Sequence, residues 1–205
     1  MSLPKHIEEA IHHYLVSMEG WTTPERGCEM AEAVYEVGHD VAVSIGVFSG
    51  RSVVAMGFAF RDMHRGMIYG LDPWKVASAT EGDSDPKNKE WWAEKANLEE
   101  MHKHTMTVIW LHGLDPWATI IRAASQDVHQ LFNEIGVLEI DGNHSELASC
   151  RDVELYLPKV VSGGRIFFDD SDWSTTQKAV GMLSDQCDLI KDGRDNTAYR
   201  IYRKR

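Results

Sequence analysis

Three aspartates follow apolar runs in the second half of the chain, and carboxylates in this arrangement could bind a metal ion. Asp141 ends the run 137–141, and Asp169 and Asp170 end the run 163–170. Ligands of open α/β sheets bind beyond the carboxyl ends of the strands, so neighbouring strands would bring these three carboxylates to one rim. Carboxylate oxygens are the ligands that Mg²⁺ and similar hard cations prefer. Each aspartate taken alone also fits a helix cap or a turn.

A turn containing two glycines is the second candidate for ligand binding. The segment 45–52 reads IGVFSGRS, with Gly46 and Gly50 between an apolar run and a helical pattern. Glycine lets the backbone come close to a ligand at the N-terminus of a helix. The spacing is neither GxGxxG nor that of a triphosphate-binding loop, so neither a dinucleotide nor a nucleoside triphosphate is favoured. Taken alone, the turn also fits an ordinary strand–helix connection.

A further acid follows this turn at a spacing that suits a nucleoside. Asp72 ends the run 67–71, about twenty residues after the glycines, where an acid can hold two ribose hydroxyls. Pro73 fixes the backbone after it, and Trp74 would offer a flat face to an adenine ring. An Asp-Pro turn beside a buried tryptophan is the alternative. The glycine turn and Asp72 together predict an adenosine-type cofactor.

His144 follows Asp141 by three residues and is the candidate proton acceptor. Histidine titrates near neutrality, so it can act as a general base beside a metal ion. A histidine that makes a structural hydrogen bond at the start of a helix is the alternative. The residues alone leave both interpretations open.

The elements that would position these residues follow from the hydrophobic pattern. Strand-like and helix-like runs alternate, which predicts an α/β fold: a Rossmann-like, doubly wound, mostly parallel sheet with helices on both faces. The last run alternates in the manner of a half-exposed edge strand. Strands are expected at 41–47, 67–71, 117–123, 137–140, 165–168, 187–190 and 197–202, and helices at 7–18, 30–38, 51–60, 125–135, 147–157 and 175–183.

The chain is expected to form a single domain, since 205 residues can bury one sizeable core. Residues 1–38 would be a helical lead-in, and residues 75–104 an insertion over the active-site rim, with a loop followed by a long helix. The insertion carries Trp91 and Trp92. These rings would stack on a sugar or an aromatic ring, or serve internal packing or a dimer contact.

Composition narrows the class of partner. Lys and Arg number 21 and Asp and Glu 32, and this net charge of −11 disfavours nucleic acids and anionic membranes. The three cysteines are widely spaced and odd in number, so neither a disulfide framework nor a cysteine metal site is expected. The sequence has neither a signal-peptide layout nor an apolar run of the ~18 residues that a membrane span needs. A cytoplasmic protein is therefore expected.

Four motifs in order resemble one enzyme family over about residues 20–185. They are IGVFSGRS at 45–52, GLDPW at 70–74, EIDGNHS at 139–145 with RDVELYLPK at 151–159, and GGRIFFDD at 163–170. The set is similar to class I S-adenosylmethionine-dependent methyltransferases. Within them it resembles the metal-dependent macrocin- and mycinamicin-type O-methyltransferases and the cephalosporin-hydroxylase-like family.

The resemblance implies a seven-stranded sheet with an antiparallel last strand, and it assigns roles to single residues. Asp141, Asp169 and Asp170 match magnesium ligands, His144 matches a proposed base, and family members are often homo-oligomers. The cofactor would lie against a larger set, in which Asp72 binds the ribose and Ser125 lies near the adenine: Trp21, Thr22, Thr23, Gly46, Phe48, Gly50, Ser52, Asp72, Pro73, Trp74, Ser125 and Asp141.

Two positions depart from the family pattern. Ser44 stands where an acid usually supports the glycine loop and the cofactor amine, and Asn143 stands where some members have an acidic base. The second departure shifts the base role to His144 or to the metal. The resulting hypothesis is a Mg²⁺-assisted O-methyltransferase acting on a hydroxyl of a small molecule, such as a sugar, phenol or polyketide. The alternatives are a metal-dependent hydrolase or hydroxylase-like enzyme, and a non-catalytic S-adenosyl-binding protein.

Overall fold

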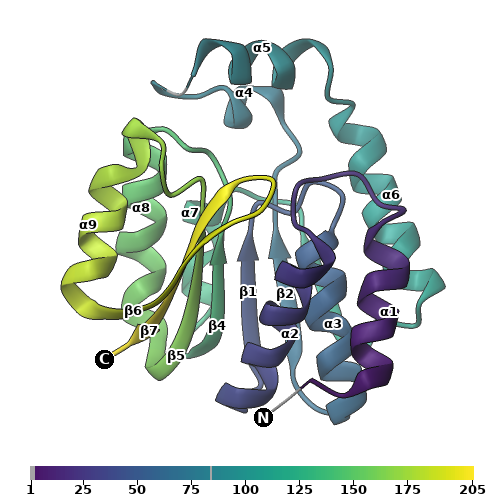
Figure 1. Ribbon diagram of the computed structural model, residues 1–205. Coiled ribbons are helices and arrows are strands. Elements are labelled where there is room, and N and C mark those ends of the chain that lie inside the picture. The colour runs from purple at the N-terminus through teal and green to yellow at the C-terminus, as the bar shows by residue number, and fades with distance from the viewer. Residues whose placement is uncertain (1–2, 84) are drawn as a thin grey trace.

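A seven-stranded sheet with helices on both faces forms the core of the protein (Figure 1). The structure is a computed structural model, and it describes residues 3–83 and 85–205. The strand order is β3-β2-β1-β4-β5-β7-β6, and β7 runs antiparallel to both of its neighbours. The strands are β1 (Val41–Ile45), β2 (Met67–Leu71), β3 (Ala118–Ile121), β4 (Ile135–Ile140), β5 (Val160–Asp169), β6 (Cys187–Arg194) and β7 (Ala198–Lys204).

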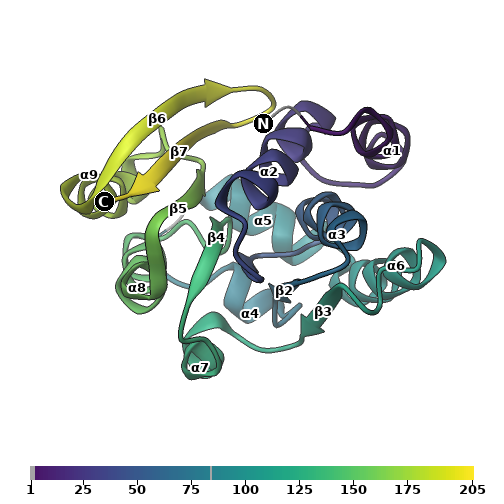
Figure 2. The same ribbon diagram turned by 90° about the horizontal axis from the view of Figure 1, so that it is seen from below.

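Helices cover the two faces in separate groups (Figure 2). Each group packs its apolar side chains on the sheet and closes one of two hydrophobic clusters. Two short helices, α4 and α5, lie instead across the carboxyl end of the sheet (Figure 1). One face carries α1 (Lys5–Leu15), α2 (Pro24–Val37), α3 (Arg51–Met63) and α6 (Leu98–Leu111), the other carries α7 (Ser125–Val128), α8 (Glu146–Tyr156) and α9 (Gln177–Gln186), and the end carries α4 (Val76–Ala79) and α5 (Pro86–Glu94).

Local sequence explains where α2 starts and stops. Thr23 caps its N-terminus by accepting a hydrogen bond from the Arg26 N–H, and Pro24 occupies the first turn, where no N–H is needed. Gly38 ends the helix in the left-handed conformation, with φ of +64°. β4 follows the rule for a central parallel strand, since all six of its residues are buried. These elements fix the backbone on both sides of the site.

The structure confirms the mostly parallel α/β sheet and corrects three details. The helix expected at 125–135 is a single α-turn followed by a short 3₁₀ turn, and Ile135 already begins β4. The 75–104 segment forms α4, α5 and the start of α6 rather than a loop and one helix. The alternating last strand is not the edge, because β7 lies between β5 and β6 and the largely exposed β6 covers it. Within the described residues, no helix has the length and apolar character to cross a membrane.

Candidate active site

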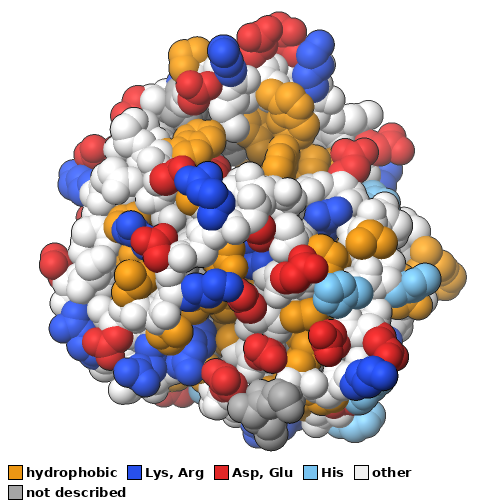
Figure 3. Space-filling view, in the orientation of Figure 1, with side chains coloured by type: hydrophobic (Ala, Val, Ile, Leu, Met, Phe, Trp, Pro, Cys, Tyr) orange, Lys and Arg blue, Asp and Glu red, His pale blue; other side chains and the backbone are white. Residues whose placement is uncertain are grey.

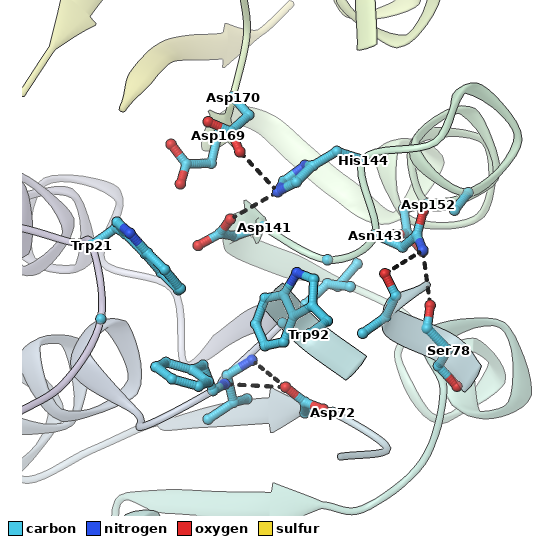
Figure 4. A pocket seen from close by; sticks show the side chains of 18 of the residues that line it. Trp21, Asp72, Ser78, Trp92, Asp141, Asn143, His144, Asp152, Asp169 and Asp170 are labelled. Carbon is cyan, nitrogen blue, oxygen red and sulfur yellow. Dashed lines mark hydrogen bonds and ion pairs between the residues drawn. The ribbon is translucent and has the colours of Figure 1, made fainter. Parts of the chain in front are cut away.

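The carboxyl ends of the central strands open into a cavity of about 600 Å³ below α4 and α5. In the space-filling view, hydrophobic side chains gather around a recess beneath the uppermost helices (Figure 3). Acidic residues at the ends of β4 and β5 face the cavity from one side, and the glycine turn faces it from the other (Figure 4). Of the predicted site residues, these line the cavity: Trp21, Thr22, Gly46, Phe48, Ser52, Asp72, Pro73, Ser125, Asp141, His144, Asp169 and Asp170.

The Asp72 carboxylate holds the backbone of the glycine turn in place. Its Oδ2 accepts hydrogen bonds from the N–H groups of Val47 (3.0 Å) and Phe48 (3.1 Å). Burial raises the pKa of Asp72, and these backbone donors oppose the rise. Gly46 has φ of +87°, and a Cβ there would lie 1.9 Å from the Asp141 carbonyl oxygen. Only glycine fits this close approach of β1 to β4.

Trp74 and Gly50 support the turn from behind and do not line the cavity. The Trp74 indole N–H donates to the Phe48 carbonyl (2.9 Å), and its ring lies 4.7 Å from that of His102. Trp74 is only 4% exposed, so the expected flat face toward adenine is not presented to the cavity. A Cβ at Gly50 would lie 2.9 Å from Thr105 Cγ2, which explains this glycine by packing against α6.

Ser125 is held by an acid that the sequence analysis missed. Its hydroxyl donates to Asp152 Oδ1, and its carbonyl accepts from the Tyr156 hydroxyl at 2.8 Å. Asp152 also lines the cavity, and burial raises its pKa to about 6. The sequence offered no signal for it, because Asp152 lies away from the apolar stripe expected for the helix 147–157 and is buried only by tertiary packing.

His144 connects two of the predicted carboxylates. Its Nε2 lies 3.1 Å from Asp170 Oδ2 and 3.6 Å from Asp141 Oδ1 (Figure 4). Burial lowers the pKa of His144, which favours the neutral imidazole. Burial together with Asp169 raises the pKa of Asp170 to about 7, and burial and the neighbouring acids hold that of Asp141 well above its usual range. Burial and mutual repulsion therefore oppose full ionisation of the carboxyl groups in this cluster.

A buried arginine supplies the cation of this cluster, and the sequence analysis did not find it. Arg26 is 2% exposed, and its Nη1 donates to Asp169 Oδ1 at 2.7 Å. It also donates to both carboxylate oxygens of Asp195 and to the Thr197 hydroxyl. Its guanidinium lies 4.3 Å from the centre of the Tyr199 ring. Arg26 thus ties α2 to the end of β5 and to the β6–β7 turn.

Four aromatic rings from three segments meet at the cavity. Trp21 lies 5.4 Å from Phe48 and 5.2 Å from Trp91, measured between ring centroids. Trp92 lies 4.9 Å from Trp91 and 5.6 Å from Phe48. All four residues line the cavity, so α5 contributes a hydrophobic wall to it.

Comparison with known proteins identifies the family to which the chain belongs. The sequence profile of a family described as a methyltransferase domain matches residues 43–171, well over half of the chain. This protein belongs to that methyltransferase family. No curated protein sequence matches it.

Solved structures share the fold of this methyltransferase. They include the O-methyltransferase NovP (17% identity, TM-score 0.69, 89% of this chain and 80% of that chain). The SAH-bound methyltransferase PaMTH1 of Podospora anserina has 13% identity, TM-score 0.66, and coverage of 100% and 90%. The O-methyltransferase of Bacillus cereus in complex with SAH has 12% identity, TM-score 0.61, and coverage of 98% and 92%. At these identities the similarity establishes the fold.

The three predicted magnesium ligands of this methyltransferase lie at one rim of the cavity, and each of them already contacts other side chains of the protein. Arg26 and Thr197 donate to Asp169 Oδ1, and His144 contacts Asp141 and Asp170. In the described ranges, no group of three or more His, Cys, Asp or Glu residues is arranged to hold a metal ion. The donor set nevertheless fits a divalent cation in chemistry, because it offers the hard carboxylate oxygens that such cations prefer.

Asn143, the second departure from the family pattern, forms hydrogen bonds that hold the segment 78–81 in place above the cavity. Its Nδ2 donates to the carbonyls of Ser78 (2.8 Å), Ala79 (3.2 Å) and Glu81 (3.1 Å), and its Oδ1 accepts from the Ser145 N–H. A carboxylate at this position could not donate to those carbonyls. The structure therefore gives Asn143 a structural task.

We expect Asn143→Asp to loosen α4 and α5. The change places a negative charge against three carbonyl oxygens and should cost about 1–3 kcal/mol of local stability. Hydrogen exchange of the amides in 76–94 should become faster, while exchange in β4 stays unchanged. Asn133→Asp, which adds the same charge at an exposed position, is the matched control. Unchanged exchange in 76–94 would show that Asn143 does not hold this segment.

Proposed function

We propose that this protein is an S-adenosylmethionine-dependent O-methyltransferase that acts on a hydroxyl group of a small molecule. The observation that carries the proposal is one cavity with two chemically distinct ends. The glycine turn braced by Asp72 forms one end, and His144 with Asp141 and Asp170 forms the other. Membership of the methyltransferase family supplies the reaction class.

The cofactor would lie along the first end, from Thr22 and Ser52 past Gly46 to Asp72 and Ser125. Gly46 lines the cavity there, and its missing side chain lets β1 approach β4 closely at this point of the turn. Asp72 lines the cavity, and its Oδ1, which accepts from the Trp74 N–H (2.7 Å), keeps a second lone pair for a ribose hydroxyl. S-adenosylmethionine supplies an electrophilic methyl group when bound there.

His144 would take the proton of the acceptor hydroxyl. Its lowered pKa keeps it neutral at pH 7 and so able to accept. The imidazolium formed in this way would lie beside Asp170 and Asp141, and the nearby charge of Asp169 favours the protonated ring. The protein's other contribution is to hold the acceptor oxygen in line with the methyl group and to exclude water.

Magnesium assistance is part of the proposal. Asp141, Asp169 and Asp170 would hold the ion, which would polarise the acceptor hydroxyl. The support is that all three carboxyl groups line the same cavity. Burial and the neighbouring acids raise the pKa of Asp141 and Asp170, and a bound cation would favour their ionised forms.

The acceptor would carry a ring. Trp21, Trp91 and Trp92 form an aromatic wall, and the Trp173 ring lies 5.2 Å from that of His144. A flat or ring-shaped molecule such as a phenol or a sugar can stack on such a wall while it presents a hydroxyl to His144.

Calorimetric titration of the protein with S-adenosylhomocysteine, in Mg²⁺ and again in EDTA, tests the proposal. We expect binding in both buffers and a separate heat from Mg²⁺ alone. Absence of S-adenosylhomocysteine binding in both would overturn the function. Mg²⁺ binding without nucleoside binding would favour the hydrolase-like alternative. Binding of S-adenosylhomocysteine without methyl transfer to any sugar or phenol in an acceptor screen would favour the non-catalytic one.

A further inference from the structure

A buried glutamate lies behind the glycine turn, and among residues 3–83 and 85–205 its direct hydrogen-bond partners are hydroxyl groups. Glu139 on β4 is 2% exposed and is the register partner of Ser44 on β1. Its Oε2 accepts from the Ser44 hydroxyl and its Oε1 from the Ser52 hydroxyl, both at 2.6 Å. Arg26 affects it only through space, since the Arg26 donors reach Asp169, Asp195 and Thr197.

This contact fixes the direction of a chain of hydroxyl groups that reaches the cavity. A serine hydroxyl has one proton, and Ser52 gives its proton to Glu139. Ser52 Oγ lies 3.3 Å from Thr22 Oγ1, and Thr22 is then the donor in that pair. Ser52 and Thr22 both line the cavity, whereas Glu139 and Ser44 lie behind them. The Ser52 oxygen can therefore accept a hydrogen bond from a ligand at this end of the cavity, and its own hydrogen bond to the Glu139 carboxylate makes it a stronger acceptor.

We propose that Glu139, acting through Ser52, positions the cofactor by recognising its α-ammonium group. A cationic donor with three protons matches an acceptor oxygen that a buried carboxylate polarises. A carboxylate of the ligand would meet like charge at the same place. Glu139 is thus a positioning residue at the amino-acid end of the cofactor, supplied by β4 to a turn that begins on β1. The inference rests on the proposed function, because it takes S-adenosylmethionine as the ligand.

A buried carboxylate with no cation in hydrogen-bonding contact, as Glu139 is among the described residues, is a poor stabiliser of the fold, and this supports a task in binding. Taking a carboxylate out of water is costly, and two hydroxyl donors compensate for it only in part. A neutral glutamine has the same shape and removes that cost. We therefore expect Glu139→Gln to fold with a thermal midpoint equal to or above that of the wild type.

The test compares two ligands that differ only in the ammonium group. S-adenosylhomocysteine and its desamino analogue, in which hydrogen replaces the amino group, are titrated into the wild type, Glu139→Gln and Ser52→Ala. We expect each variant to weaken S-adenosylhomocysteine binding about tenfold to a hundredfold, and binding of the desamino analogue by less than about threefold. Ser44→Ala is the matched control, since Ser44 contacts Glu139 away from the cavity, and it should change the ratio of the two affinities little.

The outcomes separate this inference from the function on which it rests. If wild type binds neither ligand, the proposed function fails. If wild type binds both and Glu139→Gln weakens both equally, Glu139 only supports the turn and the inference is overturned. An equal effect of Ser44→Ala and Ser52→Ala on the affinity ratio would also overturn it, because the direction of the hydroxyl chain would then not matter.

Discussion

Replacing His144 with Gln should lower kcat for methyl transfer by about 10²- to 10⁴-fold, the usual contribution of a general base. Glutamine keeps a polar side chain of similar reach but cannot take up a proton at neutral pH. The side chain lies between Asp141 and Asp170 and against Trp173, at the end of the cavity opposite Asp72. The affinity for S-adenosylhomocysteine should therefore stay close to that of the wild type. Steady-state assays with an acceptor found by screening sugars and phenols would measure kcat, and calorimetry the affinity.

The matched control for this variant is His13→Gln, an exposed histidine on α1 far along the chain from the site. It should leave both kcat and affinity unchanged. Retention of more than about a tenth of the wild-type kcat by His144→Gln would move the base role away from His144. A parallel loss of cofactor affinity would instead indicate that His144 maintains the shape of the cavity.

The parts of this protein that could be predicted are those that depend on short-range pattern. β2 has the bounds that its apolar run predicts, 67–71, because Asp72 and Pro73 end the strand through local chemistry. Asp141, Asp169 and Asp170 lie at one rim because parallel neighbours β4 and β5 must end on the same side. Pattern and topology together were enough for these residues.

The parts that could not be predicted depend on contacts between distant segments. Arg26 precedes the helix expected at 30–38 and belongs to no motif, and only the fold brings Asp169 and Asp195, more than a hundred residues away, onto its guanidinium. Glu139 interrupts an apolar strand, yet its partners become visible only when β1 and β4 are paired in register. Trp74 was misplaced for the same reason, because its burial depends on α6 passing behind the turn. The sequence locates the rim, and the packing decides which side chains at the rim face the cavity.

Replacing Arg26 with Met should destabilise the protein by about 3–5 kcal/mol, the usual cost of removing one partner from a buried ion pair. Methionine keeps much of the apolar stem but leaves Asp169 and Asp195 without their cation. It also removes the donors to Thr197 and the contact with the Tyr199 ring. Urea unfolding at pH 7, followed by circular dichroism, would measure the free energy of unfolding.

The matched control is Arg203→Met, because Arg203 pairs with Asp188 at 3.2 Å on the exposed side of the β6–β7 hairpin. An exposed pair of this kind contributes about 1 kcal/mol or less. The double variant Arg26→Met with Asp195→Asn should recover part of the lost stability, since it removes one of the two carboxylates left unpaired. If Arg26→Met instead unfolded at the same urea concentration as Arg203→Met, Asp169 and Asp195 would be hydrated or protonated in the variant, and the loss of Arg26 would not reduce the free energy of unfolding. Arg26 would then orient the acids at the rim without contributing to the stability of the fold.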